Sequence, residues 1–373
     1  MEAWSLRDRT CVVGVGTTSY GVFPDQDDYS LAVEALSNAL TDAGLRYEDL
    51  DGLILNRIRS YERFAEITRL DPQYCMRTDE EGRLSGMSLM LAVQAVASGL
   101  AEVVACVYGN NAKSAGVTYG GADDVDRWAP WGYTSMGAMH AMMFQRHMHQ
   151  FGTTSADLAH ISVAFRKHAA LNPSAVMRKP IAIDDHQASR YIAEPLHLFD
   201  YCLINDGGVA LIVTSAERAK DLAKPPVFVS GFACQDTLAH SSVPPTDFWY
   251  PALQKVERNI YGRSGISRDA VDGLMIYDNF TPTVLFSLEG MGFCPQGEGG
   301  AFVRDGALEL GSGRWPTNTS GGHLSESYMQ GWALLGEAVR QCRGECGQRQ
   351  ISDCEVVQYI CATNMALSII FRS

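Results

Sequence analysis

The sequence predicts a layered α/β fold made of two similar halves. Short apolar runs alternate with segments whose apolar residues recur at helical spacing, which is the pattern of an α/β domain. Residues 44–54 are also matched by residues 265–275 at a constant offset. A chain of 373 residues, 46% of them hydrophobic, is long enough to bury two packed halves. We therefore expect a duplicated fold with a pseudo-twofold axis.

The elements of the first half can be placed from apolar runs and their boundaries. The run from Cys11 to Val15 predicts a strand that is closed by Gly14 and Gly16. The next segment carries apolar side chains at helical spacing, and Gly44 follows it as a helix stop signal. We predict helices at residues 30–42 and 86–98, and strands at residues 53–55, 103–108, 210–213 and 227–229.

Two collinear repeats and one long insertion suggest how the chain is divided. In the first repeat, both copies follow a predicted helix and enter a strand. The second repeat pairs residues 82–85 with residues 322–325, each followed by a helix and then a strand. Residues 112–197 are rich in methionine and hold most of the nine histidines, and a connection of this length is usually functional. We predict a first half at 1–235, with 112–197 as an inserted loop domain over a ligand cleft, and a second half at 236–373.

Composition excludes several classes of function. A formal net charge of −13 disfavours a nucleic-acid scaffold. No apolar run is long enough to span a membrane, and the N-terminus lacks the apolar core of a signal peptide, so we expect a cytoplasmic protein. The ten cysteines are scattered through apolar runs, as is typical of reduced buried thiols. Their spacing completes no tetrahedral zinc site, so we expect no structural metal in this chain.

Six motifs, spread in order along nearly the whole chain, carry a family resemblance. They stand at residues 13–18 (VGVGTT), 151–156 (FGTTSA), 200–210 (DYCLINDGGVA), 277–280 (YDNF), 292–300 (GFCPQGEGG) and 318–328 (NTSGGHLSESY). Together they resemble the thiolase superfamily, nearest to the sterol-carrier-protein type of thiolase and its bacterial lipid-transfer-protein relatives. This resemblance implies a five-layer αβαβα thiolase fold, a loop domain in the first half and a dimer.

The departures from the family pattern concern the residues that do its chemistry. Thiolases carry the acyl group on a cysteine at the N-terminus of the central helix of the first half. That position falls at about Gly82, and no cysteine lies between Cys75 and Cys106. The two family histidines are matched by Tyr277 and Tyr328. A further cysteine lies near the last family motif, at Cys361, where we interpret it as buried packing.

This pattern resembles one branch in particular, the thiolase-like aldolases of steroid side-chain degradation. The resemblance implies retro-aldol cleavage of a β-hydroxyacyl-CoA steroid side chain, giving a 17-ketosteroid and propionyl-CoA or acetyl-CoA without a covalent cysteine intermediate. It also implies a small OB-fold partner of the zinc-ribbon type, and a homodimer within a heterotetramer. We expect no cofactor in this chain, because CoA is part of the substrate, and expect zinc only in the partner.

Retro-aldol cleavage assigns tasks to residues. It needs a base at the β-hydroxyl, hydrogen-bond donors at the thioester oxygen and an acid at the α-carbon. We expect Tyr277 and Tyr328 to divide the two proton transfers, in either order. The residues expected to support the oxyanion and the cleft are Gly82, Asp278, Asn279, Gly321, Gly322 and His323. The basic residues expected either to meet the CoA phosphates or to form a solvated loop are Arg166, Lys167, Arg178 and Lys179.

Two other functions stay open. A 3-ketoacyl-CoA thiolase would keep a reactive cysteine, so iodoacetamide would inactivate it. A non-catalytic subunit that binds acyl-CoA or lipid would show no C–C cleavage even with its partner. A metal site at His140, His147 and His149 is disfavoured, because these residues lie on a Met-rich helical stretch that we interpret as loop-domain core.

Overall fold

The structure is a computed structural model that describes residues 4–79, 84–117, 135–237, 244–363 and 365–373. Nine strands in these ranges form one mixed sheet in the order β3-β2-β4-β7-β1-β8-β11-β10-β9. Their bounds are β1 Thr10–Thr17, β2 Gly52–Asn56, β3 Tyr74–Thr78, β4 Val103–Asn110, β7 Gly207–Ser215, β8 Val227–Asp236, β9 Gly273–Ile276, β10 Val356–Ala362 and β11 Met365–Arg372.

The strand order repeats itself in reverse about the centre of the sheet. On one side β2 runs parallel to β4, and β4, β7 and β1 then alternate in direction. On the other side β9 runs parallel to β10, and β10, β11 and β8 alternate in the same way. The two sets meet where β1 pairs with β8. This order groups β8 with the second half, whereas the predicted boundary at residue 235 falls near the end of that strand.

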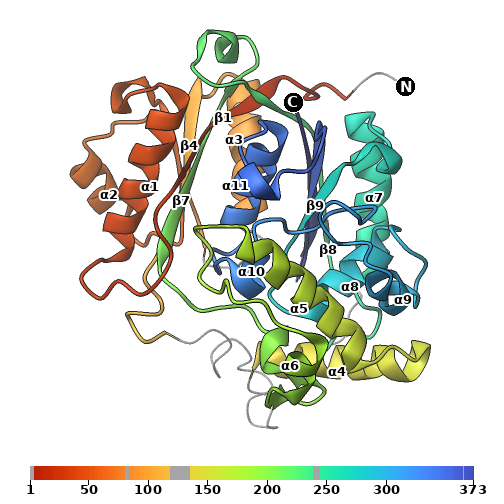
Figure 1. Ribbon diagram of the computed structural model, residues 1–373. Coiled ribbons are helices and arrows are strands. Elements are labelled where there is room, and N and C mark those ends of the chain that lie inside the picture. The colour runs from red at the N-terminus through yellow and green to blue at the C-terminus, as the bar shows by residue number, and fades with distance from the viewer. Residues whose placement is uncertain (1–3, 80–83, 118–134, 238–243, 364) are drawn as a thin grey trace.

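The helices complete five layers (Figure 1). Helix α1 (Asp28–Ala43) covers β1, β7 and β4, while α7 (Tyr250–Ser264) covers β8 and β11. Helices α3 (Leu84–Ala97) and α11 (Trp332–Cys342) lie between the two parts of the sheet. The layers therefore run helix, sheet, helix, sheet, helix, as the family resemblance implies.

The two glycines that were expected to close the first strand lie inside it, so that expectation was wrong. A side chain at Gly16 would place its Cβ 2.0 Å from the carbonyl oxygen of Ala35, and one at Gly14 would place it 2.4 Å from that of Ala39. At both positions the strand backbone lies directly against the backbone of α1. The glycines serve close helix–sheet packing instead of a turn.

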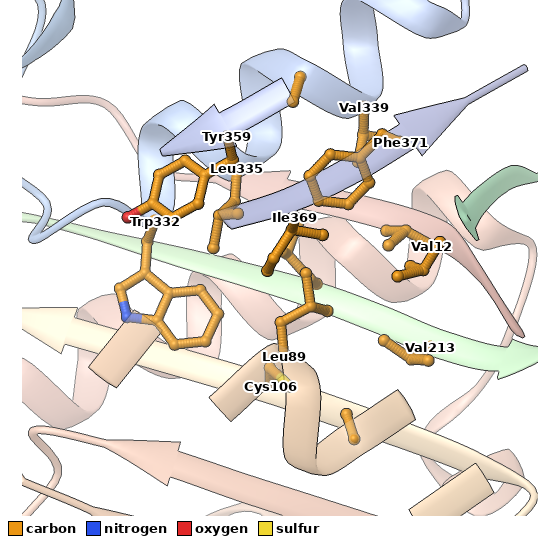
Figure 2. Close-up of a cluster of buried hydrophobic side chains, with 14 of the residues drawn as sticks. Val12, Leu89, Cys106, Val213, Trp332, Leu335, Val339, Tyr359, Ile369 and Phe371 are labelled. Atoms are coloured by element: carbon orange, nitrogen blue, oxygen red, sulfur yellow. The ribbon is translucent and has the colours of Figure 1, made fainter. Parts of the chain in front are cut away.

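The central layer is the main hydrophobic core, and Figure 2 shows part of it. Leu89 of α3 and Leu335 of α11 pack with strand residues of both halves, including Val12 and Ile369. Helix α3 is apolar on nearly every side because protein surrounds it. One polar contact of this cluster joins the two halves, where Trp332 Nε1 donates to Asn56 Oδ1 at 2.8 Å.

The described part of the segment predicted to be an inserted loop domain is largely helical. It holds α4 (Met136–Phe151), α5 (Ser155–Ala170), α6 (Ile183–Ala188), β5 (Tyr191–Ala193) and β6 (Leu196–His197). His140 and His147 are buried with Met139 and Met143, as expected for a core stripe, whereas His149 is exposed and is not part of it. The remaining helices are α2 (Tyr61–Thr68), α8 (Thr281–Gly290), α9 (Gly299–Arg304) and α10 (Gly322–Ser325).

The buried carboxylate of Glu289 connects α4 to the second half through hydrogen bonds. Glu289 of α8 accepts hydrogen bonds from His147 Nε2 at 3.1 Å, from the amide of Gly299 at 2.8 Å and from the Tyr250 hydroxyl. Burial raises the pKa of Glu289, but hydrogen bonds from His147, Gly297 and Tyr250 outweigh it, so the pKa is lowered overall. Glu289 is therefore ionised at neutral pH and joins three parts of the chain.

Across the described ranges, no helix is both long and apolar enough to cross a lipid bilayer. In the same ranges, no group of three His, Cys, Asp or Glu side chains is placed to hold a metal ion.

We predict that Glu289→Gln lowers the free energy of unfolding by about 3 kcal/mol at pH 7, because buried donors lose their charged acceptor. Since the folded pKa of Glu289 is lowered, its contribution is full above the unfolded pKa and is lost as pH falls through the folded pKa. Denaturant unfolding at pH 7 and in acid should therefore show a gap between wild type and variant that narrows in acid.

Glu309→Gln is the matched control, since Glu309 pairs with the half-exposed Lys167. It should cost less than about 1 kcal/mol at either pH. Equal losses in the two variants would contradict the role of Glu289 as a junction.

Candidate active site

Two phenols that lie far apart in the sequence form a buried pair. Tyr277 follows directly after β9, and Tyr328 lies between α10 and α11. Their hydroxyl oxygens are 2.9 Å apart, within hydrogen-bond distance. Tyr277 is 2% exposed and Tyr328 is 8% exposed. The structure thus brings together the two residues that the sequence predicts to be catalytic.

Asp278 and His323 lie directly beside this pair. The His323 ring meets the Tyr277 ring edge-on at 4.6 Å between centroids and the Tyr328 ring at 5.1 Å. Asp278 Oδ1 accepts the amide of His323 at 2.9 Å and lies 3.2 Å from His323 Nδ1. His323 Nε2 accepts the amide of Gly331 at 2.9 Å. The imidazole is therefore held on both sides.

The glycine pair at the start of α10 makes this approach possible. Gly321 and Gly322 have φ angles of 105° and 61°, the left-handed region that glycine favours. A Cβ on Gly322 would lie 2.2 Å from Asp278 Oδ2. The two amides donate within the protein, that of Gly321 to the Asn318 carbonyl and that of Gly322 to Ser320 Oγ. Their predicted approach to an oxyanion stays a prediction.

Asn279 organises the turn after Tyr277. Its Oδ1 accepts Thr283 Oγ1 at 2.8 Å and the amide of Phe280 at 3.1 Å, which orders the start of α8. Its carbonyl accepts the amide of Cys202 at 3.0 Å. The sequence predicts that Asn279 supports the cleft, whereas these contacts favour a role in forming the turn. Gly82 lies outside the described residues.

Burial sets the protonation states at the site. Burial, and then the neighbouring Tyr328, raises the pKa of Tyr277 well above its usual value of 10.0. Burial lowers the pKa of His323 to about 3 and raises that of Asp278, although backbone amides act on Asp278 in the opposite direction. At neutral pH the Tyr277 phenol is protonated and the imidazole is neutral. Since Nε2 accepts a hydrogen bond, the imidazole proton is on Nδ1, beside Asp278.

The four basic residues expected at the CoA phosphates lie in different surroundings. Arg166 is buried, and its Nε donates to Ser325 Oγ in α10 at 2.8 Å. Lys167 pairs with Glu309 at 2.7 Å. Arg178 and Lys179 are exposed. The structure thus uses Arg166 inside the protein and presents the other three side chains to solvent to differing degrees.

A segment of the first half, residues 202–205, also holds the site, and sequence reasoning missed its role. Asn205 Oδ1 accepts the amide of Tyr328 at 2.8 Å. The amide of Leu203 donates to the His323 carbonyl at 2.9 Å. The segment lies within one of the six motifs, which was the available signal, but no pattern in the sequence assigns a partner to a buried amide side chain.

A second missed group lies where α3 begins. Tyr359 Oη is 3.3 Å from Ser85 Oγ, and both residues are fully buried. A Cβ on Gly331 would lie 2.4 Å from Tyr359 Oη and 2.5 Å from Ser85 Oγ, so Gly331 sits directly beside them. Tyr359 and Cys361 occupy alternate positions of β10, a period-2 signal that could have placed both on one face.

Two cysteines lie close to the phenols. Burial, and then the Asp278 carboxylate, raises the pKa of the Cys202 thiol, which disfavours the nucleophilic thiolate. Cys361 is fully buried in β10, as the sequence predicts. Cys75 is exposed on the edge strand β3, and burial of part of its surface raises its pKa.

Comparison with known proteins gives consistent results. The family model described as "Thiolase C-terminal domain-like" matches residues 235–366. The chain is 38% identical to a "Steroid side-chain-cleaving aldolase" of Thermomonospora curvata, covering 91% of each chain. It is 39% identical to a "17-hydroxy-3-oxo-4-pregnene-20-carboxyl-CoA lyase" of Mycobacterium tuberculosis, covering 91% of this chain and 92% of that relative.

Solved structures agree with the sequence relatives. The structure of an "Ltp2-ChsH2(DUF35) aldolase" superposes with a TM-score of 0.91 at 36% identity and covers 99% of both chains. Human mitochondrial 3-ketoacyl-CoA thiolase has the same fold, with a TM-score of 0.74 at 12% identity over 99% of both chains. The thiolase fold that the sequence motifs imply is confirmed.

We predict that Gly322→Ala destabilises the protein by at least about 2 kcal/mol, since its Cβ meets Asp278 and its φ angle is positive. Gly262→Ala is the control, because a Cβ there meets nothing within 4 Å inside helix α7, and it should stabilise by about 0.5–1 kcal/mol. Thermal unfolding of both variants checks this. A neutral effect of Gly322→Ala would contradict the packing of α10 on Asp278.

Proposed function

The chain belongs to the thiolase superfamily, in the branch of the sterol-carrier-protein-type thiolases and the steroid side-chain-cleaving aldolases, and on this basis we propose that it is an acyl-CoA aldolase. Its reaction is the retro-aldol cleavage of a β-hydroxyacyl-CoA steroid side chain. The products are a 17-ketosteroid and propionyl-CoA, or acetyl-CoA from a shorter branch.

The observation that carries this proposal is the buried pair of phenols, Tyr277 and Tyr328, 2.9 Å apart. Two hydroxyls joined by a hydrogen bond suit retro-aldol cleavage, because this reaction removes one proton from the β-hydroxyl and delivers one proton to the α-carbon. The raised pKa of Cys202, at the same site, argues against an acyl group carried on that sulfur. The phenol pair therefore favours cleavage without a covalent cysteine intermediate.

The reaction balances with these two groups alone. One tyrosine oxygen takes the proton of the β-hydroxyl as its own phenol proton passes across the hydrogen bond to the other tyrosine, the C–O bond becomes a carbonyl, and the Cα–Cβ bond breaks. The electron pair of the broken bond passes to Cα and forms the enolate of the thioester. The second tyrosine gives its own proton to Cα and yields the acyl-CoA product, so that both phenols are protonated again at the end. No oxidant, reductant or metal enters this balance.

Since the Tyr277 pKa is raised, its phenol is a proton donor in the resting protein. Phenolate character at either tyrosine requires positive potential from the bound complex, and the N-termini of α3 and α11 supply part of it. Donors to the thioester oxygen would come from backbone amides near Gly321 and Gly322 once substrate displaces their internal bonds.

The protein assembly is part of the proposal. The similar solved structure bears the name Ltp2-ChsH2(DUF35) aldolase, which joins two components. We propose that this chain likewise works with a small OB-fold partner of the zinc-ribbon type, as a homodimer within a heterotetramer. Co-expression with such a partner should yield a stable co-purifying complex by size-exclusion chromatography with light scattering. Separate elution of the two proteins at micromolar concentration would contradict this part.

We predict that Tyr277→Phe and Tyr328→Phe each lower kcat/KM for cleavage about 100-fold or more, because each removes a hydroxyl that moves a proton. The assay measures ketone release from a β-hydroxyacyl-CoA steroid by the co-purified complex. Tyr261→Phe is the control, since the Tyr261 hydroxyl of α7 donates to Gln358 Oε1 at 3.0 Å and lies outside the site. It should leave kcat/KM unchanged.

Turnover near that of wild type in both site variants would overturn the assigned chemistry. Ligand binding without ketone release in the wild-type complex would indicate instead a non-catalytic acyl-CoA-binding subunit. Inactivation by iodoacetamide together with an acyl-enzyme mass shift would indicate a thiolase.

A further inference from the structure

We infer that His323 and Asp278 act as a positioning pair that sets the geometry of the two phenols and takes no direct part in proton transfer. This inference rests on the proposed function, since it concerns the same site. It gives these two residues a task different from the donation to an oxyanion that the sequence suggests.

Both nitrogens of the imidazole lie against the protein, and only Nε2 makes a hydrogen bond. Nε2 is occupied by the amide of Gly331 at 2.9 Å, and Nδ1 lies 3.2 Å from Asp278 Oδ1. Because Nε2 accepts, it carries no proton to give to a thioester oxygen. The Nδ1 proton lies beside the carboxyl group of Asp278. His323 is consequently placed as a support.

Asp278 is also occupied by hydrogen bonds within the protein. It accepts the amide of His323 at 2.9 Å and that of Leu324 at 3.3 Å. These bonds tie the residue that directly follows Tyr277 to the first turn of α10. The position of Tyr277 along the chain is thereby linked to the position of His323.

The far side of the imidazole links to the second phenol and to α11. Gly331 is the residue from which α11 begins, and its φ angle is 92°. A Cβ there would lie 3.4 Å from Tyr277 Cδ2, so this residue also borders the Tyr277 ring. Tyr328 lies between the two ends of this link, three residues before Gly331, and its ring packs edge-on against His323 at 5.1 Å. His323, which precedes Tyr328, and Gly331, which follows it, are therefore joined by the hydrogen bond of the imidazole across the loop that carries Tyr328.

The arrangement therefore has one consequence for the phenols. Asp278, His323 and Gly331 form a chain of contacts that brackets both tyrosines, and the edge-on rings fill the space between. Loss of the imidazole should let the loop that carries Tyr328 move by up to about 1 Å. A shift of that size at a reacting group can reduce turnover about 100-fold.

Three replacements of His323 separate the hydrogen bond of Nε2 from the contact of Nδ1 with Asp278. His323→Leu removes both. His323→Gln can present an amide oxygen to the Gly331 amide, and His323→Asn can present an amide N–H to Asp278. We expect His323→Leu to lower kcat about 10- to 100-fold with KM within about 3-fold of wild type. At least one of the two amides should recover a measurable part of that loss.

The matched control is a second buried histidine–carboxylate pair. His186 Nε2 lies 2.9 Å from Asp200 Oδ1, and both side chains are fully buried in the loop-domain region. His186→Leu should lower thermal stability to a similar extent but leave kcat of the folded complex unchanged. This comparison separates positioning from general destabilisation.

A crystal structure of His323→Leu provides a readout that does not depend on activity. We expect the Tyr277–Tyr328 oxygen separation to exceed 3.5 Å in His323→Leu and to stay near 2.9 Å in His186→Leu. An unchanged separation, or unchanged kcat in His323→Leu where the wild-type complex cleaves, would overturn the inference and leave the proposed function standing. If the wild-type complex does not cleave, the proposed function fails, and the oxygen separation alone decides the positioning role.

Discussion

The hydrogen bond between Tyr277 and Tyr328 is the interaction on which the site depends. Both hydroxyls are removed from water, so each needs a partner, and at 2.9 Å each is a partner for the other. A buried phenol without a partner would cost free energy, so the surrounding protein must hold the two loops together. Much of the structure around the site can be understood as the means of doing so.

Each half of the molecule contributes to that support. The second half supplies both tyrosines, together with Asp278 and the short helix α10. The first half supplies residues 202–205, which bind the backbone of the site through Asn205 and Leu203. The central helices α3 and α11 begin close together, since a Cβ on Gly331 would lie 2.5 Å from Ser85 Oγ. The site thus lies where the two repeated units meet.

The sequence predicts the fold and the phenol pair for different reasons. Helices and strands follow from periodicity, and the two-half plan follows from the repeat at residues 44–54, because these signals are local. The pairing of Tyr277 with Tyr328 is not local, and only the resemblance to a family with two residues of one site at these positions made it predictable. Gly14 and Gly16 were misjudged, because a glycine at a turn and a glycine under a helix look alike in sequence.

Other features of the site depend on contacts that no local pattern encodes. The role of Asn205 requires knowing which loop of the other half it meets, and the internal bond of Arg166 to Ser325 requires knowing that α5 packs on α10. The role of His323 could not be predicted for the same reason, since it follows from the hydrogen bond that Nε2 accepts from Gly331 and from the contact of Nδ1 with Asp278. Charge and residue type can nominate such side chains, but the packing of distant segments decides what they do.

The most direct measurement is a crystal structure of the complex with a CoA thioether analogue that keeps the β-hydroxyl but replaces the thioester carbonyl by a methylene. Such a compound cannot form the enolate and therefore stays intact in the site. The account predicts that the β-hydroxyl oxygen lies within hydrogen-bond distance of the Tyr277 or Tyr328 oxygen. A cysteine sulfur in contact with the methylene carbon, with both phenols turned away from the ligand, would contradict it.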